Sequence, residues 1–479
     1  MGRSLPLVVA AAVVLLLILV LAPLVLAGMY IRNPKVNYHG GASTQRTNSI
    51  FRGIKRIWKH RDELTPPSGG QKTDEVKAAD TAGLFIFNLS VGTGAASPQN
   101  ISGILDITTP LVWSQCAPCS DCLPPPAPTF QPDQSPTFAA LPCGSDTCQS
   151  MLTQTCTANA TETDQDYCVY TGVYGADTNT TGYLANDTFT FGNISVPSLV
   201  FGCSVASVGD FAGASGVFGF SRGPLSLMSQ LQLSWFSYFL ASDDDSQSGS
   251  SFFQFGGEDV KQTTTTTTTN SGSAASPLLT SQLHPELYYV NLTGIRVGKD
   301  LVDIPAGTFG LRANGSGGVF LSTTMPVTFL EETAYDMVKQ AFVKHFNDTA
   351  GVQPVDASAL GLDLCYNYNK IQSNVAVPEM ALVFDGEATM ELKEYNYFFA
   401  DDTSNGGTGL ACLTMLPYQG VSLLGSLLQT GRTMTYDIGN AKSQQLIFET
   451  AAPAAAAAPA AHSLLLMMAL PLAAWVLLF

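Results

Sequence analysis

The sequence predicts a mainly β protein built from two related lobes, and two observations carry this prediction. First, short apolar stretches alternate with Gly, Pro, Asn and Ser, as in LFIFNLSVGTG and YLANDTFTFGNISVPSLVFG. This rhythm is typical of many short strands rather than of long helices. Second, the region between about Ala82 and Phe448 divides into two halves that carry the same features in the same order. The 479 residues suffice for two lobes and for targeting segments at both ends.

Each half contains an acid-or-hydroxyl turn that is followed later by an apolar-apolar-Gly element. These features lie in Ile101–Trp113 and Gly213–Leu231 of the first half, and in Gly317–Leu330 and Gly420–Ile438 of the second. A run of seven threonines between the halves has no core pattern and predicts a solvated loop. The predicted boundaries are 82–260 for the N-terminal lobe, 261–280 for the linker loop and 281–449 for the C-terminal lobe.

The charge of the chain excludes one class of partner. A net charge of −16 and a pI near 4.6 argue against nucleic acid, because phosphate binding needs a basic face. The basic residues cluster early, in Phe51–Leu64, inside a segment (28–81) that we interpret as a propeptide or stalk. Contact of this cluster with anionic lipid head groups is the alternative.

Both ends of the chain predict a secretory route. Residues 1–27 combine Arg3, a long apolar run and a small-residue cleavage site, which indicates a signal peptide or an uncleaved signal anchor. Residues 450–479 combine small residues, a spacer and a terminal apolar tail, which indicates a glycosylphosphatidylinositol attachment signal; a plain tail anchor is the alternative. We therefore expect a monomer tethered by its C-terminal lipid at the extracellular face of the plasma membrane or in the cell wall.

Asn-x-Ser/Thr sequons support the same route, since they are acceptors of N-linked glycans in secreted proteins. The chain has nine of them: Asn88, Asn100, Asn159, Asn179, Asn186, Asn193, Asn291, Asn314 and Asn347.

The ten cysteines indicate disulfides rather than a metal site. Their even numbers in the two halves suit bonds formed within each lobe in an oxidising compartment. The run from Cys116 to Cys122 could also suggest zinc or an iron–sulfur cluster, but we predict no metal and no cofactor. The predicted disulfide cysteines are Cys116, Cys119, Cys122, Cys143, Cys148, Cys156, Cys168, Cys203, Cys365 and Cys412.

The ordered motifs resemble those of the nepenthesin-type aspartic proteases of plants, which are pepsin-like. The resemblance rests on NLSVGT, LVWSQCAPCSDC, CVYTGVYGADTNTTGYLANDTFTF and VFGCS in the first half, and on YYVNLTGIRVGKDLVDIP, LCYNY and VSLLGSLLQTGRTMTYDIGN in the second. It implies two β lobes that face each other across a substrate cleft. It also implies two catalytic aspartates, one in an Asp-Thr/Ser-Gly turn of each lobe, that share one proton.

The catalytic turns depart from that pattern. The first reads DITT from Asp106, so the aspartate is retained while its hydroxyl and glycine neighbours are replaced. The second reads STTM, with Ser322 in place of the aspartate. Asp106 then has no carboxyl partner, and the pKa of a serine hydroxyl is too high for it to act as the missing acid. Loss of general acid–base catalysis costs about 10²–10⁴-fold, and threonines in place of glycines add bulk where the backbones should meet.

Other positions bear on the same site. Tyr174 aligns with the family's flap tyrosine, while Asp177 replaces a hairpin glycine and predicts an altered flap. Ser322 is not expected to be a nucleophile, because neither His284 nor His345 lies in a motif that would place a base beside it. Phe239 stands where the family has a cysteine, and no cysteine follows Cys412, so a family disulfide is lost without leaving an orphan thiol.

Three functions compete. The first is a non-catalytic surface protein that binds a peptide, protein or glycan in its cleft, as cereal xylanase inhibitors show for this scaffold. The second is an active aspartic endopeptidase. The third is a structural cell-surface glycoprotein without a ligand. The altered turns favour the first.

Overall fold

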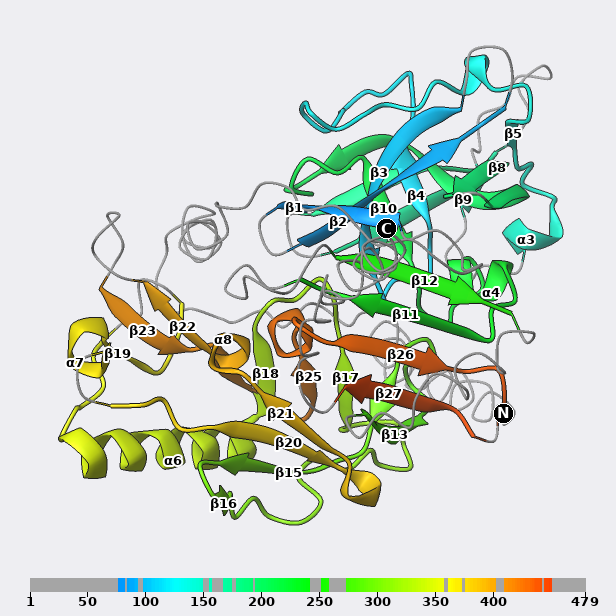
Figure 1. Cartoon of the computed structure of the whole chain (residues 1–479). Helices are drawn as coiled ribbons and strands as arrows, with labels where there is room; N and C mark the ends of the chain where they lie inside the picture. The colour runs from blue at the N-terminus through cyan, green and yellow to red at the C-terminus, as the bar shows by residue number, and fades with distance from the viewer. Residues whose placement is uncertain are drawn as a thin grey trace, which may run out of the picture.

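The protein consists of two β lobes, one above the other in Figure 1. The computed structural model describes residues 76–81, 84–93, 98–149, 155–156, 167–174, 178–192, 194–241, 251–257, 273–356, 361–372, 375–401, 409–441 and 443–449. The predicted signal segment and lipid-attachment signal lie outside these ranges. None of the described helices is long and apolar enough to cross a membrane. The predicted mainly β, two-lobed architecture is confirmed.

The N-terminal lobe is formed almost entirely by strands. Its strands are β1 (Val76–Thr81), β2 (Leu84–Val91), β3 (Gln99–Asp106), β4 (Trp113–Gln115), β5 (Ala139–Ala140), β6 (Thr155–Cys156), β7 (Cys168–Val173), β8 (Asn179–Phe191), β9 (Ile194–Val208) and β10 (Gly216–Gly219). Its helical turns are η1 (Pro132–Gln134), α3 (Asp146–Gln149) and α4 (Leu227–Gln230). Strands β8 and β9 form a long antiparallel hairpin, and β7 pairs with β8.

The C-terminal lobe adds one long helix to its strands. The strands are β14 (Tyr289–Val290), β15 (Leu292–Val297), β16 (Asp300–Leu301), β17 (Val319–Leu321), β18 (Thr328–Glu331), β19 (Cys365–Asn367), β20 (Met380–Phe384), β21 (Thr389–Leu392), β22 (Phe398–Asp401), β23 (Leu410–Leu413), β24 (Met415–Tyr418) and β25 (Ser422–Leu424). The helical segments are α6 (Glu332–Ala350), α7 (Tyr368–Gln372), η4 (Asp385–Glu387), α8 (Glu394–Tyr397) and η5 (Ser426–Gln429). Helix α6 lies along the outer side of this lobe and packs against β15, β18 and β24.

The two lobes repeat one strand arrangement. In the N-terminal lobe, β3 runs parallel to β10, which is antiparallel to β4, and β4 is parallel to β9. In the C-terminal lobe, β17 runs parallel to β25, which is antiparallel to β18, and β18 is parallel to β24. Asp106 ends β3 and Ser322 directly follows β17, so the two residues occupy matching positions in the two lobes.

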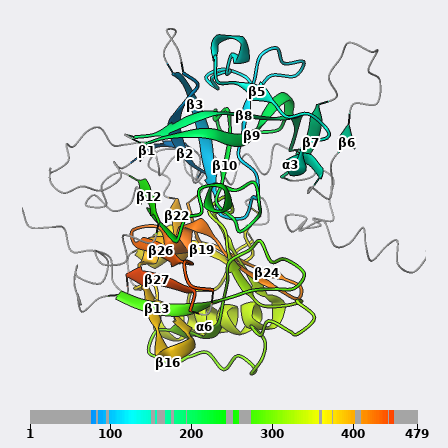
Figure 2. The same ribbon diagram turned by 90° about the vertical axis from the view of Figure 1, so that its right-hand side faces the viewer.

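A sheet of six described strands joins the lobes. Its order is β1, β12 (Phe252–Gly256), β11 (Trp235–Phe239), β26 (Thr433–Asp437), β27 (Gln445–Glu449) and β13 (Ser273–Leu279), and every neighbouring pair is antiparallel. Figures 1 and 2 show β12, β26 and β27 between the two lobes. Because strands from both halves of the chain pair here, the sheet fixes one lobe on the other.

Two predicted boundaries need correction at this sheet. Strand β1 lies within the segment 28–81 that was interpreted as a propeptide or stalk, yet it pairs with β2 and β12. Strand β13 lies within the predicted linker loop 261–280 and pairs with β27. Neither segment has a strong strand pattern of its own, so long-range backbone pairing decides its structure.

Disulfides close both lobes. The bonds are Cys116–Cys203, Cys119–Cys122, Cys148–Cys168 and Cys365–Cys412. Cys143 is also disulfide-bonded, and the side chain of Cys156 lies outside the described part of the chain. The predicted disulfides of the run from Cys116 to Cys122 are therefore confirmed.

A stacked aromatic pair occupies the position where the family has a cysteine. Phe239 ends β11 and lies opposite Phe252 of β12, with ring centroids 5.7 Å apart and planes 14° apart. Only 6% of Phe239 is exposed. Apolar packing thus holds the ends of β11 and β12 together at a position where the resemblance implies a disulfide.

One ion pair on α6 gives a pH-dependent contribution to stability. Lys339 and Tyr335 both donate hydrogen bonds of 2.7 Å to one carboxylate oxygen of Asp363. Partial burial by itself would raise the pKa of Asp363, but the bonds from Lys339 and Tyr335 and the charge of Lys339 outweigh it and lower that pKa. A carboxyl whose pKa is lowered in the folded state stabilises the protein above its unfolded pKa, and this contribution is lost as pH falls through the folded pKa.

We therefore expect Asp363→Asn to lower the free energy of unfolding at pH 7 by less than about 1 kcal/mol, because the pair is partly exposed. The difference from the native chain should shrink as pH falls below about 4 and be smaller at pH 2 than at pH 7. Urea unfolding at both pH values measures it, with the exposed Asp336→Asn on the same helix as control. An equal loss at both pH values would contradict this assignment.

Candidate functional site

The first turn of the site follows β3, and the backbone directly after β10 holds it. The backbone N–H of Phe220 donates a 2.8 Å hydrogen bond to the carbonyl oxygen of Asp106. The side chain of Asp106 is 2% exposed. Its position at the end of a central strand therefore brings a carboxylate to the boundary between the lobes.

Three donors from its own turn hold the Asp106 carboxylate. The N–H and the hydroxyl of Thr108 donate to Oδ1 at 2.8 and 2.6 Å, and the hydroxyl of Thr109 donates to Oδ2 at 2.7 Å. The resemblance places a glycine at position 108, so the Thr108 hydroxyl is an additional donor in this chain. Among the ion pairs of the described residues, none involves Asp106.

The second turn follows the matching strand, β17, and carries a different side chain. The N–H of Ser322 donates to the carbonyl of Leu424 at 3.1 Å, and Ser322 is 3% exposed. Its Oγ accepts from the N–H groups of Thr324 and Met325 at 3.3 and 3.2 Å. The hydroxyl therefore takes the position of one carboxylate oxygen, and no second oxygen is present to act as a base or an acid.

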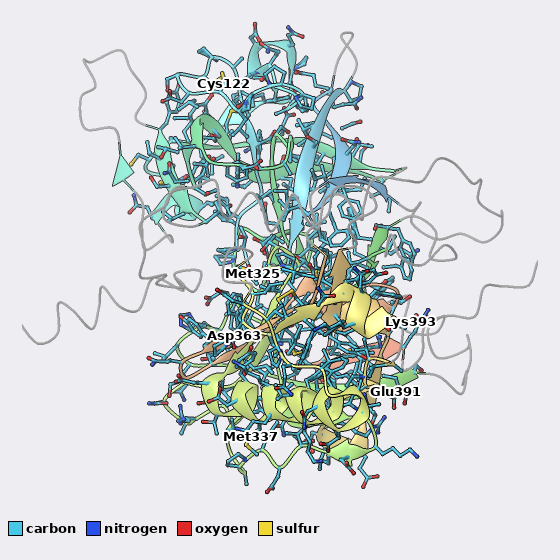
Figure 3. The ribbon with its side chains drawn as sticks, turned by 90° about the vertical axis from the view of Figure 1, so that its left-hand side faces the viewer. Cys122, Met325, Met337, Asp363, Glu391 and Lys393 are labelled. Carbon is cyan, nitrogen blue, oxygen red and sulfur yellow. A yellow bond between two sulfur atoms is a disulfide. The ribbon has the colours of Figure 1, made fainter. Side chains whose placement is uncertain are left out.

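Met325 removes a further polar group from the second turn. It follows Ser322 by three residues, as Thr109 follows Asp106, so the two matching positions differ in chemistry. Thr109 donates a hydrogen bond to its aspartate, whereas a thioether has no proton to donate. Figure 3 shows Met325 at the end of the C-terminal lobe that faces the N-terminal lobe. The second turn has thus lost both its carboxylate and the hydroxyl that would support one.

Thr323 joins the two turns. Its hydroxyl donates to the carbonyl of Leu105 at 2.7 Å and accepts from the N–H of Ile107 at 3.3 Å. Ile107 occupies the matching position of the first turn and is fully buried. It has no hydroxyl, so its side chain makes no hydrogen bond to the second turn. The expected crowding by threonines does not keep the turns apart, because Thr108 and Thr324 are half-buried at their surface.

Two glycines allow the strands behind the turns to approach closely. A Cβ atom on Gly219 would overlap the carbonyl oxygen of Thr109, and one on Gly425 would lie 2.5 Å from the carbonyl oxygen of Pro326. These are the glycines of the two apolar-apolar-Gly elements. That part of the sequence pattern therefore has a direct steric cause.

Tyr174 lies beside the first turn. Its hydroxyl accepts a 2.6 Å hydrogen bond from Nε1 of Trp113, and its ring contacts those of Trp113 and Phe211. Burial, followed by the negative charge of Asp106, raises the pKa of Tyr174, while hydrogen bonds to Trp113 and Thr109 act in the opposite direction. Tyr174 therefore keeps its proton and connects the flap with the Asp106 turn. The altered residue Asp177 lies outside the described ranges.

The sequence missed Trp113 and Thr109 as site residues. A tryptophan directly after a buried strand segment was visible in LVW, but only the fold brings its indole N–H to Tyr174. Thr109 was recognised as part of the turn but not as a donor to Asp106.

Neither histidine of the lobes serves the site. His284 Nδ1 lies 3.4 Å from Glu286, and His345 Nε2 lies 3.0 Å from the carbonyl oxygen of Ala376. In the described ranges, no cluster of three or more His, Cys, Asp or Glu side chains could hold a metal ion. The chemistry of the site therefore reduces to one carboxylate, a set of hydroxyls and a flap tyrosine.

Comparison with known proteins agrees with this geometry. Residues 85–257 match a family described as xylanase inhibitor N-terminal, and residues 287–450 match its xylanase inhibitor C-terminal counterpart. The chain is 34% identical to aspartic proteinase nepenthesin-1 of Nepenthes gracilis over 398 residues, which cover 82% of this chain and 83% of that protein. It is 29% identical to aspartyl protease 37 of Oryza sativa over 76% of this chain and 80% of that protein.

Solved structures support the fold. The basic 7S globulin of soybean superposes with a TM-score of 0.58 at 19% identity, covering 79% of this chain and 95% of that chain. Conglutin gamma of lupine seeds gives a TM-score of 0.57 at 20% identity, over 79% and 94%. Together with the paired turns and the repeated strand arrangement, these similarities show that the chain belongs to the plant nepenthesin-type family of pepsin-like aspartic proteases.

Proposed function

We propose that this chain is a catalytically inactive aspartic-protease homologue of the secretory pathway that holds a polypeptide between its lobes without cleaving it. The observation that carries this proposal is the second turn, where Ser322 and Met325 replace the carboxylate and its supporting hydroxyl. Hydrolysis needs one group to deprotonate water and another to protonate the scissile carbonyl oxygen at the same time. A single carboxyl group, that of Asp106, cannot be deprotonated as the base and protonated as the acid at the same time.

Features that bind rather than cut are retained, and they support a binding role. Tyr174 is fixed by Trp113 beside Asp106, and Thr323 still joins the turns. A protonated tyrosine, a carboxylate and the hydroxyls of Thr108 and Thr324 offer donors and acceptors to the backbone of an extended peptide. We place the protein at the cell surface or in the cell wall, anchored by lipid at its C-terminus.

A second candidate function is inhibition of another protein, such as a cell-wall hydrolase. The observation that favours it is the match of both lobes to a family described by xylanase inhibition. In that case the partner is a folded protein that contacts the lobes from outside, and the residues around Asp106 are not required for binding.

Peptide capture tests the proposal. The full chain, secreted from plant cells, is incubated with a random peptide library from pH 2.5 to 6, and retained peptides are identified by mass spectrometry. We expect intact peptides to be retained by the native chain and retention to fall about tenfold in Tyr174→Ala, since a lost aromatic anchor costs over 1 kcal/mol. Cleaved peptides would indicate an active endopeptidase. Absence of retained peptides at every pH would remove peptide binding and leave the inhibitor function.

A further inference from the structure

Strands β7, β8 and β9 form a sheet next to Tyr174, here called the flap sheet, and its outer face carries two exposed valines on either side of an asparagine. Val173 of β7 lies directly opposite Asn179 of β8, and Asn179 lies directly opposite Val208 of β9. Residues that lie opposite one another on neighbouring strands project from the same face. The three side chains therefore form one row across the sheet.

The exposure of this row is unusual for apolar side chains. Val173 is 47% exposed and Val208 is 51% exposed, whereas the other strand valines whose burial is described are buried or half-buried. Asn179 is half-buried between them, and its side-chain amide makes no hydrogen bond with any described residue. By contrast, the amide oxygen of Asn314 accepts from Ser316 at 2.8 Å and that of Asn347 accepts from Gln353 at 2.6 Å.

Asn179 begins the sequon Asn179-Thr180-Thr181. We propose that Asn179 carries an N-linked glycan whose first sugar residues lie over Val173 and Val208. On the predicted secretory route, the side-chain nitrogen of Asn179 loses a proton and bonds to the first sugar of a lipid-linked oligosaccharide donor. The bond between that sugar and the donor's pyrophosphate breaks, and the lipid pyrophosphate leaves. The side-chain amide of Asn179 is available for this bond. A pyranose ring has an apolar face, so its contact with both valines removes apolar surface from water.

The glycan projects away from the candidate site. The N–H of Tyr174 donates to the carbonyl oxygen of Thr178 at 2.8 Å, so Tyr174 and Thr178 form the next pair along the hairpin after Val173 and Asn179. Because side chains alternate along a strand, those of Tyr174 and Thr178 project from the opposite face. Thr180, next to Asn179, is buried on that inner face and donates to Ser204 at 2.7 Å. The glycan therefore covers the outer face of the flap sheet and leaves Tyr174 beside Trp113.

Glycan occupancy is measured on the full chain secreted from plant cells. Peptide-N-glycosidase A in heavy-oxygen water converts each glycosylated asparagine into a labelled aspartate, which peptide mass spectrometry locates. We expect label at Asn179 in most molecules. An unlabelled Asn179 overturns the proposal, whichever other sequons carry label.

The role of the valines needs a second measurement. Asn179→Gln is expected to increase the binding of a hydrophobic fluorescent dye severalfold and to promote association of the chain. The triple variant with Val173→Thr and Val208→Thr should return both properties to the native level. Asn88→Gln is the matched control, since Asn88 is exposed on β2 and lies opposite Ser102 rather than a valine. Equal dye binding by Asn179→Gln and Asn88→Gln would show that no glycan covers these valines.

Discussion

Rebuilding both turns is expected to raise peptide cleavage by at least about 10²–10⁴-fold over the native chain, the range associated with general acid–base catalysis. The variant combines Ile107→Thr and Thr108→Gly with Ser322→Asp, Thr324→Gly and Met325→Thr. It restores two carboxylates that can share one proton, and it gives each carboxylate a supporting hydroxyl. Initial cleavage rates of a peptide library between pH 2.5 and 6 measure the effect.

The single variant Ser322→Asp is the matched comparison. We expect it to gain much less activity, because the thioether side chain of Met325 cannot add a hydrogen bond to that of its backbone N–H, and because Thr324 still occupies the glycine position of the turn. Asp106→Asn in the rebuilt background should remove the gained activity. A rebuilt chain that is folded, retains peptides and still does not cleave them would show that the missing carboxylate is not the cause of inactivity.

Thr323→Val is expected to lower the free energy of unfolding by about 2–4 kcal/mol, since a buried polar group left without a partner costs about 1–3 kcal/mol. Valine has nearly the shape of threonine, but it leaves the carbonyl of Leu105 and the N–H of Ile107 without their described partner. Thr323 is fully buried, so water cannot replace the hydroxyl. Equilibrium urea unfolding, followed by tryptophan fluorescence, gives the difference.

Thr324→Val is the control for that measurement. Thr324 is half-buried, and its hydroxyl lies 3.3 Å from the hydroxyl of Ser322 in the same turn. We expect a loss below about 1 kcal/mol for a partly exposed bond of this kind. If both variants lost the same small amount, the Thr323 hydroxyl would not be holding the lobes together.

The sequence predicted those parts of the structure that depend on residues close together in the chain. The DITT and STTM turns lie at matching positions because the strand pattern repeats, and Gly219 and Gly425 mark places where side chains do not fit. The cysteine spacing predicted disulfides, although it did not give their pairing. Motif order was sufficient for fold and family.

The parts that sequence could not give depend on contacts between distant segments. Strands β1 and β13 were interpreted as stalk and linker because their own residues carry little strand pattern, and pairing with β12 and β27 decides their structure. The bonds from Thr323 to the other lobe, and from Trp113 to Tyr174, join residues far apart in the chain. Burial of Tyr174 and its raised pKa follow from that packing and not from its neighbours in sequence.

Cleavage by the native chain itself tests the central claim most directly. Native protein and its Asp106→Asn variant are purified in parallel and incubated with a peptide library from pH 2.5 to 6, and new peptide termini are counted by mass spectrometry. The absence of a second carboxylate predicts that both proteins leave the library intact and give the same background. Cleavage by the native chain that pepstatin inhibits and that Asp106→Asn abolishes would contradict the account and identify a working aspartic protease.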